Sequence, residues 1–301
     1  MEGVPFMPEM LGFFGRVFTV EAQVGRACDT VNYSGVLRLR NTVIVDDLRC
    51  NGTGHDGCGA QCRLYWKEAW LRPASAAGNG EDVTAGDAFA RLQRLAAVSV
   101  HGADSTPEAP TFRCQATELI RAGEPVGWYR FARELTGGNV GIWRFARVTV
   151  GIVFQEIGRR LGLRKNPPFR PEELKGQNFV APAPRGLRTG ELVQIRTKHE
   201  ISETLGDTGR NKGLWFDREM VPYCGQTARV KAKVERFIDE RTGRMVELAS
   251  DCYILDGVVC KSYNSVNRWF CPRAIYPWWR ECWIRPIEPQ TSDAAQDSRD
   301  D

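Results

Sequence analysis

The sequence lacks several features by which enzymes and membrane proteins are recognised. Only three of its 301 residues are histidines, and it contains no phosphate-binding loop, dinucleotide-binding fingerprint or Ser/His/Asp order. No apolar run is long enough to span a bilayer, and the N-terminus does not have the order of a secretory signal. We therefore expect a cytoplasmic protein without a transmembrane segment.

Long runs of one charge are also missing, which limits the case for nucleic-acid binding. The formal net charge is +4, and residues 288–301 carry five acids against one arginine. This stretch predicts a disordered acidic tail. Basic residues on a predicted strand keep nucleic-acid binding open as an alternative: Arg229, Lys231, Lys233 and Arg236.

Cysteine, by contrast, is plentiful. The chain has ten cysteines, 42% hydrophobic residues and 26% charged residues, which is the composition of a globular protein. In a reducing compartment ten cysteines indicate metal ligands or reactive thiols rather than a disulfide framework. Buried free thiols are the alternative.

One segment of the sequence occurs twice. Residues 3–50 align with residues 213–260 at an offset of 210, and residues 58–73 align with residues 271–286 at an offset of 213. Of the 64 aligned residues, 20 are identical. The identical pairs include Phe6 with Phe216, Glu9 with Glu219, Cys50 with Cys260, Trp66 with Trp279 and Trp70 with Trp283. This similarity indicates an internal duplication of one structural unit.

Both copies have the pattern of short strands joined by turns. In the second copy, residues 226–239 alternate in polarity, 241–244 form a turn, and further strands are predicted at 245–248 and 252–260. Residues 187–196 add a turn and a strand that have no counterpart in the first copy. Because exposed strand edges are usually covered, we expect the middle region or the other copy to replace that strand.

The residues between the copies follow a helical pattern instead. Helices are predicted at 85–98 and around 138–163, and the second is too polar to cross a membrane. The similar segments Trp128–Arg133 and Trp143–Arg147 are interpreted as an amphipathic face, with binding to an anionic or lipid surface as the alternative. Prolines from 167 to 184 predict a linker.

Two sets of motifs resemble known families. The pattern Gly190-Glu191-x-Val193-x-Ile195, followed by Met220-x-x-Tyr223-Cys224-Gly225 and an Arg229-Val230 strand, resembles the SH3-like barrel of the nitrile hydratase β subunit. That resemblance implies the fold alone, since the metal-binding cysteine cluster of the partner α subunit is not found in this sequence. Residues 3–10, 50–62 and 66–70 resemble an uncharacterised bacterial family, many of whose members carry both copies.

Together these observations predict a mainly β protein with an α insert, in the α+β class, built from two SH3-like units. The expected divisions are a first unit at 1–73, a helical insert and linker at 74–186, a second unit at 187–287 and the tail at 288–301. The matched tryptophans are expected to fill the barrel cores on alternating strand positions.

Four candidate metal ligands occur within thirteen residues of the first copy: Cys50, His55, Cys58 and Cys62. Glycines between them allow the tight turns that a small ion requires. Three sulfurs and one nitrogen predict a tetrahedral zinc site. An iron–sulfur cluster is the alternative, because the loop resembles that of the CDGSH iron–sulfur proteins, although their upstream cysteine pair is missing.

The second copy retains only part of this set. Cys260 and Cys271 correspond to Cys50 and Cys58, and Ile275 aligns with Cys62. A second candidate site would recruit Cys252 or Cys282, or the two copies would share one ion.

These residues favour a zinc-binding protein that acts as a binding or scaffold component of a bacterial pathway, with an unidentified protein or peptide partner. The alternative is a metalloenzyme or redox protein that works at the same loop. In that case Cys62 would give way to water, or Cys58 and His55 would form a nucleophile pair. The aromatic clusters offer a further alternative, the stacking of a planar or proline-rich ligand.

Overall fold

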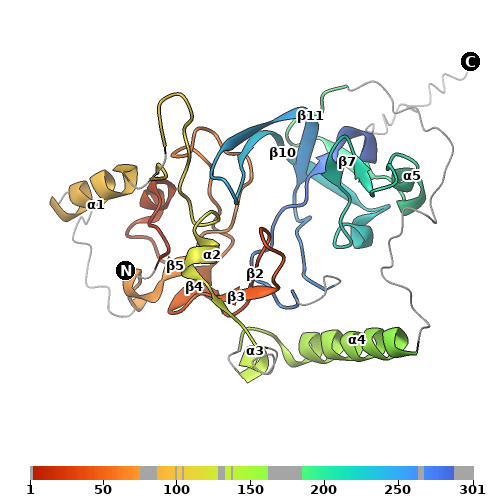
Figure 1. Ribbon diagram of the computed structural model, residues 1–301, viewed down its shortest axis with the longest axis horizontal. Helices are drawn as coiled ribbons and strands as arrows, with labels where there is room; N and C mark the ends of the chain where they lie inside the picture. Colours follow the sequence, from red (N-terminus) through yellow and green to blue (C-terminus); the bar gives the residue numbers. More distant parts are fainter. Residues whose placement is uncertain are drawn as a thin grey trace, which may run out of the picture.

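The computed structural model describes residues 3–74, 87–98, 100–103, 105–127, 133–136, 138–161, 185–263 and 268–287. The protein is mainly β with few helices, and its strands form several small sheets (Figure 1). The predicted tail at 288–301, the predicted linker at 167–184 and residues 128–132 of the aromatic segment lie outside the described residues.

Unit 1, residues 3–73, consists of short strands between two 3-10 helices. One sheet has the order β1-β4-β5, and another has the order β2-β3-β6. The elements are η1 (Pro8–Phe13), β1 (Val20–Gln23), β2 (Ala27–Cys28), β3 (Val36–Arg38), β4 (Thr42–Val45), β5 (Trp66–Lys67) and η2 (Glu68–Trp70), and β6 (Glu124–Pro125) comes from the insert.

Unit 2, residues 187–287, contains a five-stranded sheet of order β12-β11-β10-β7-β13. Its elements are β7 (Leu192–Ile195), α5 (Lys198–Ser202), β8 (Arg210–Asn211), β9 (Leu214–Trp215), η6 (Val221–Tyr223), β10 (Thr227–Ile238), β11 (Met245–Leu255), β12 (Trp279–Arg280), η7 (Glu281–Trp283) and β13 (Ile284–Pro286). The strands predicted at 245–248 and 252–260 are thus largely one strand, β11.

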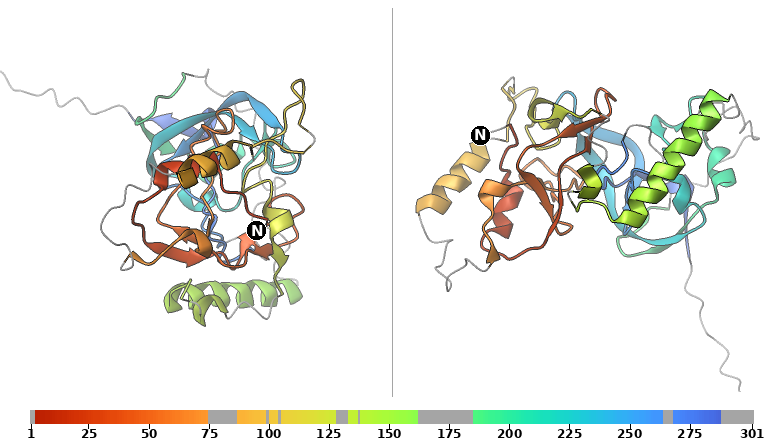
Figure 2. Two further views of the ribbon diagram at one scale, coloured as in Figure 1. Left: turned by 90° about the vertical axis from the view of Figure 1, so that its left-hand side faces the viewer. Right: turned by 90° about the horizontal axis from the view of Figure 1, so that it is seen from below.

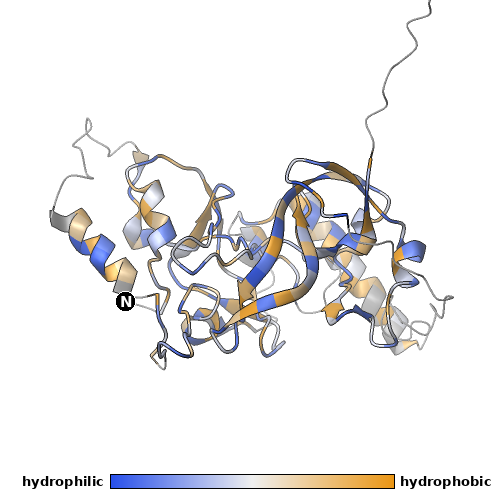
Figure 3. Cartoon of the chain, turned by 90° about the horizontal axis from the view of Figure 1, so that it is seen from above, coloured by the Kyte–Doolittle hydropathy of each residue, from blue (hydrophilic) through white to orange (hydrophobic). Residues whose placement is uncertain are grey.

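The hairpin β10–β11 follows the sequence closely. Hydrophobic and hydrophilic residues are interspersed along the hairpin (Figure 3). They alternate over most of β10, whereas β11 ends in the buried hydrophobic run at 252–255. At its tip Asp239 Oδ1 accepts the backbone N–H of Arg241 and of Thr242, at 3.1 and 2.8 Å. An aspartate that bonds its own backbone two or three residues ahead stabilises a turn, so the predicted turn at 241–244 is confirmed.

The insert supplies the helices α1 (Asp87–Val98), α2 (Leu119–Ala122), α3 (Arg133–Thr136) and α4 (Ile142–Arg160). The helices predicted at 85–98 and 138–163 are therefore confirmed, with shorter bounds. Helix α1 lies next to η1, while α4 runs along the other end of the molecule (Figure 2). Trp143 and Phe154 of α4 are exposed. Among the described residues no helix has the length and hydropathy to cross a membrane.

The two units pair their strands in the same register. Val20, Ala22 and Gln23 of β1 pair with Val45, Ile44 and Val43 of β4. At an offset of 210, Val230, Ala232 and Lys233 pair with Leu255, Ile254 and Tyr253, and the register shift after the first pair recurs. The positions that the sequence repeat aligns therefore have the same backbone pairing.

The aromatic contacts recur as well. Phe6 makes edge-on contacts with Trp66 and Trp70 at centroid distances of 6.5 and 5.2 Å. Phe216 contacts Trp279 and Trp283 in the same way at 6.1 and 5.3 Å. Trp66, Trp279 and Trp283 are buried, as expected of core residues, but Trp70 and Trp283 lie in 3-10 helices rather than on strands.

The far end of the β10–β11 hairpin packs against unit 1. The N–H of Gly59 donates to the Arg236 carbonyl at 2.9 Å, and Arg236 forms an ion pair with Asp56 at 3.0 Å. Buried Arg273 donates to the Cys28 carbonyl at 2.9 Å and pairs with Glu240 at 2.7 Å. These contacts join the two units into one packed body.

Candidate metal centre

Three side chains that can bind a metal ion meet in unit 1. Glu9, Cys50 and His55 each place one ligand atom within 4.8 Å of the other two. Glu9 lies on η1, and Cys50 and His55 lie on the loop between β4 and β5. Within the described part of the chain, this is the one group of three or more acidic, cysteine or histidine side chains at such distances.

The loop that carries Cys50 and His55 requires glycine at position 52. Gly52 has a φ of +73°, and a Cβ there would lie 2.2 Å from the Cys58 carbonyl oxygen. Its own carbonyl accepts the N–H of His55 at 3.0 Å. Because only glycine tolerates both the backbone angle and the close approach, this residue sets the turn that directs His55 toward η1.

Glu9 connects the three side chains through one oxygen. Its Oε1 lies 2.6 Å from His55 Nδ1 and 3.4 Å from Cys50 Sγ, and it accepts the N–H of Gly54 at 3.2 Å. His55 Nε2 lies 3.2 Å from the Arg113 carbonyl oxygen. Since a carbonyl only accepts, Nε2 is the nitrogen that donates here, and Nδ1 faces the carboxylate of Glu9.

Burial and the charge of Glu9 control the thiol of Cys50. Burial comes first and the negative charge of Glu9 second among the causes that raise the pKa of Cys50 far above its usual value. Burial also acts to raise the pKa of Glu9, but the hydrogen bond and the charge of His55 outweigh it, so the pKa of this carboxyl lies below its ordinary value. In this state Glu9 is the anion and Cys50 is a neutral thiol that donates to it.

The second carboxylate oxygen of Glu9 has no polar partner among the described residues. The Glu9 side chain is 1% exposed, and no hydrogen bond from the described part of the chain reaches Oε2. A buried carboxylate oxygen without a donor is costly unless it is compensated. A cation held among Glu9, Cys50 and His55 would supply that compensation.

Of the four predicted ligands, the structure brings Cys50 and His55 together and leaves the thiols of Cys58 and Cys62 outside the cluster. Cys58 packs against Val100, Phe112 and Ile238. Cys62 approaches Cys50 only through the backbone, where its carbonyl accepts the Cys50 N–H at 2.8 Å. Burial, followed by the charge of Glu240, raises the pKa of Cys62 well above its usual value.

The cysteines of the second candidate site occupy separate places. Cys252 Sγ accepts from Arg280 at 3.2 Å, and Cys282 packs against the core of unit 2. Cys271 Sγ accepts the backbone N–H of Cys28 at 3.1 Å. The hydrogen bond between these two thiols comes first among the causes that lower the pKa of Cys28 to about 6.

Unit 2 keeps two members of the cluster. Glu219 and Cys260 correspond to Glu9 and Cys50, and burial followed by the charge of Glu219 raises the pKa of Cys260 to about 12. Glu219 Oε2 accepts the N–H of Tyr263 at 3.2 Å, as Glu9 accepts the N–H of Gly54. No histidine of unit 2 aligns with His55, because the offset of 210 leads to Ser265.

Glu9 was missed as a ligand from the sequence, although a signal was present. The repeat matches Glu9 with Glu219 and Cys50 with Cys260, so the acid and the thiol recur together. Local spacing directed attention to the loop at 50–62, whereas Glu9 lies 41 positions before Cys50.

Comparison of the chain with family models, with curated proteins and with solved structures gives no match.

Proposed function

We propose that this protein binds a zinc-type metal ion through Glu9, Cys50 and His55, and that the ion supports a duplicated SH3-like protein that acts as a binding or scaffold component. The observation that supports the proposal is that a carboxylate, a thiol and an imidazole lie within 4.8 Å of one another, with Glu9 and His55 buried. Oxygen, sulfur and nitrogen at one point form a donor set that zinc accepts.

The arrangement of His55 fits such a site. In metal centres, a ligating histidine commonly donates its second ring nitrogen to a backbone carbonyl. His55 Nε2 points at the Arg113 carbonyl in this manner, which leaves Nδ1 as the ligand atom. Zinc would replace the hydrogen bond between Nδ1 and Glu9 and would displace the proton of the Cys50 thiol.

A structural role for the metal follows from burial. His55 and the Glu9 side chain are each 1% exposed. Neither the apolar pocket beside η1 nor the smaller pocket near Cys260 is lined by a member of the cluster. An ion here would fasten η1 to the loop at 50–58, which has few apolar side chains of its own.

The repeated strand register and the repeated Phe–Trp contacts support the common origin of the two units. The five-stranded sheet around β10 and β11 in unit 2 supports the SH3-like assignment. We place the protein in the cytoplasm, and its ten free cysteines support this location because thiols stay reduced there.

Metal analysis of the purified full-length chain tests this proposal. We expect about one zinc per chain, lost in Glu9→Gln, Cys50→Ser and His55→Ala. Glu219→Gln and Cys260→Ser make the same changes in unit 2 and serve as matched controls that retain the metal. Metal-free wild-type protein, purified without chelator and unable to bind added zinc, would contradict the proposal.

Two further variants distinguish this site from the four-ligand loop predicted from the sequence. Cys58→Ser and Cys62→Ser retain zinc if Glu9, Cys50 and His55 hold it, and lose it if the loop alone does. An absorption spectrum of the same samples addresses the iron–sulfur alternative, because such a cluster is coloured and zinc is not. A single cysteine in the cluster favours zinc, since iron–sulfur clusters are held by several thiolates.

A metalloenzyme is the second candidate, and the number of ligands favours it. Three protein ligands leave a fourth position of a tetrahedral zinc ion for water, as in catalytic sites. Exchange of the bound zinc for cobalt gives a visible spectrum that responds to water-displacing anions. A spectrum that azide or cyanide shifts at millimolar concentration would favour the enzyme, and an unresponsive one the structural role.

A further inference from the structure

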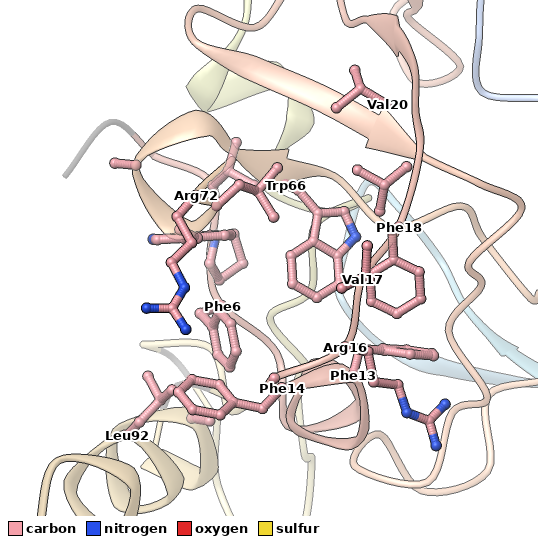
Figure 4. A pocket seen from close by; sticks show the side chains of 18 of the residues that line it. Phe6, Phe13, Phe14, Arg16, Val17, Phe18, Val20, Trp66, Arg72 and Leu92 are labelled. Atoms are coloured by element: carbon pink, nitrogen blue, oxygen red, sulfur yellow. The ribbon is translucent and has the colours of Figure 1, made fainter. Parts of the chain in front are cut away.

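A cavity of about 800 Å³ lies in unit 1, between η1, the end of η2 and α1 (Figure 4). Its walls are mainly apolar, and Phe6, Phe13, Phe18 and Trp66 point into it. We call it the edge groove. Its volume is of the size that binds ligands or short segments of chain.

In unit 2 the corresponding space is filled. Phe6, Trp66 and Leu71 of the edge groove correspond to Phe216, Trp279 and Ile284, which belong to the core of unit 2. That core also contains Val193 and Ile195 of β7, each 0% exposed. Because no strand among the described residues takes the place of β7 in unit 1, the edge groove is the place that the side chains of such a strand would occupy.

The backbone along the edge groove corresponds to the backbone that hydrogen-bonds β7 and the residue after it in unit 2. In unit 2, Ile195 donates to the Gln226 carbonyl at 2.8 Å, and Arg196 donates to the Trp283 carbonyl at 2.9 Å. The counterparts of these acceptors are the carbonyls of Arg16 and Trp70. Over the described ranges no residue hydrogen-bonds to either carbonyl. Unpaired backbone groups beside an apolar groove form a template for an added strand.

Positive charge borders the edge groove on two sides. In unit 2, Arg285 Nε donates to Gln194 Oε1 of β7 at 2.9 Å. The counterpart of Arg285 in unit 1 is Arg72. In unit 2 the Gln194 side chain also donates to the carbonyl of Gly225. The next residue is Gln226, and its counterpart in unit 1 is Arg16. Arg16 and Arg72 stand on opposite sides of the opening (Figure 4), and none of the described residues that line it is acidic.

We propose that the edge groove accepts an extended peptide of another protein as an added β-strand, with the pattern apolar–acidic–apolar. The two apolar side chains would enter the groove as Val193 and Ile195 fill unit 2, and the acid between them would meet Arg16 and Arg72. This inference rests on the binding role proposed above and is independent of the metal ion, whose ligands do not line the groove.

Two aromatic side chains distinguish the groove of unit 1 from the corresponding place in unit 2. Phe18 stands where unit 2 has Ala228, and Phe14 stands where it has Cys224. Phe14 also contacts Phe89 of α1, with centroids 5.2 Å apart. Both rings line the groove, whereas in unit 2 the chain continues from β7 into α5, so the groove suits a short strand without such a helix.

A fluorescent peptide with the sequence of residues 189–197 of this chain, carrying Gln194→Glu, is the probe. Anisotropy with the full-length protein is expected to show saturable binding. A second peptide that also carries Val193→Asp and Ile195→Asp is expected to bind at least about tenfold more weakly, because charged groups replace the apolar anchors. No saturable binding of the first peptide at millimolar protein would overturn the proposal.

Matched variants of the protein locate the site. Arg72→Glu is expected to weaken binding at least about tenfold, since two carboxylates then face each other. Arg285→Glu makes the same change in unit 2 and leaves binding unchanged. A peptide with lysine at the position of Gln194 restores binding to Arg72→Glu. A loss confined to Arg285→Glu, or equal for both variants, would show that the peptide displaces β7 and would overturn the proposal.

Hydrogen–deuterium exchange and sedimentation complete the test. Added peptide is expected to protect residues 15–20 and 70–74 and not residues 225–230. A chain that associates with itself and protects the same residues without peptide would show that a second copy fills the groove, which overturns the foreign partner. Zinc measured on the same samples separates the two proposals: peptide binding by protein that neither contains nor takes up zinc supports the edge groove and contradicts the metal site.

Discussion

Units 1 and 2 share their strand register, their Phe–Trp contacts and a buried Glu–Cys pair, but they differ in two places. Unit 2 has β7, which lies between β10 and β13 and fills its core. Unit 1 has an open groove there and gains His55 beside its Glu–Cys pair. Both differences fall in unit 1: the groove could bind a partner, and the added histidine completes a possible set of metal ligands.

The comparison separates stability from function. In unit 2 the position beside β10 and β13 is taken by β7, so a partner cannot add a strand there. In unit 1 the same position exposes apolar side chains and unpaired carbonyls. The same helix, η1, contributes Glu9 to the cluster and Phe13 to the groove. A metal ion bound to Glu9 would thus stabilise one wall of the open groove.

The largest expected effect concerns the matched tryptophans. Trp283 is fully buried, so Trp283→Ala is expected to lower the free energy of unfolding by about 3–5 kcal/mol. Trp70 lines the edge groove and is half-buried, so Trp70→Ala should cost less than half of that value. Urea denaturation followed by circular dichroism measures both. Equal losses would mean that the groove is closed in solution.

Metal removal is expected to have the next largest effect, again confined to unit 1. At free zinc one hundredfold above the dissociation constant, binding contributes about 2.7 kcal/mol to stability. EDTA should therefore lower the melting temperature of the wild type and of Glu219→Gln, but not that of His55→Ala. A drop in all three proteins on chelation would place the metal elsewhere.

Zinc binding should depend on pH through the protons that it displaces. Burial and Glu9 raise the pKa of Cys50, so the thiol stays protonated at neutral pH and must lose its proton to bind. Binding therefore releases at least the proton of this thiol, so affinity should fall as pH falls. Calorimetry in buffers of different ionisation enthalpy measures the number of protons released. Cys58→Ser, whose thiol lies outside the cluster, should release as many protons as the wild type, and zero release by the wild type would exclude the Cys50 thiol as a ligand.

The sequence predicted the repeated elements well because their signals are local. Alternation and a turn located the β10–β11 hairpin, and helical periodicity located α1 and α4 within a few residues. The sequence also predicted that the first copy lacks the strand that covers this edge, but not what lies there instead. Among the described residues no strand takes the place of β7 in unit 1, and α1 lies beside the groove instead.

The candidate site was only half foreseen because it is not local. Cys50 and His55 stand five residues apart, and their spacing identified the loop. Glu9 reaches them through the packing of η1, which depends on Gly54 lying against Pro8. Cys58 and Cys62 have ligand spacing, yet the first turns toward Phe112 and Ile238. Spacing indicates which side chains can meet, and the packing of distant segments decides which of them do.

The smallest expected effect concerns the arginines that border the two strand positions. Arg285 bonds Gln194 of β7 and is 47% exposed, so Arg285→Ala should cost at most about 1 kcal/mol. Arg72 has no described strand to hold, so Arg72→Ala should leave the free energy of unfolding unchanged. Once the apolar–acidic–apolar peptide is bound, the same Arg72→Ala change should lower the melting temperature of the complex. A cost for Arg72→Ala without peptide would show that Arg72 already makes a stabilising contact in the free protein, which would contradict a free strand position beside it.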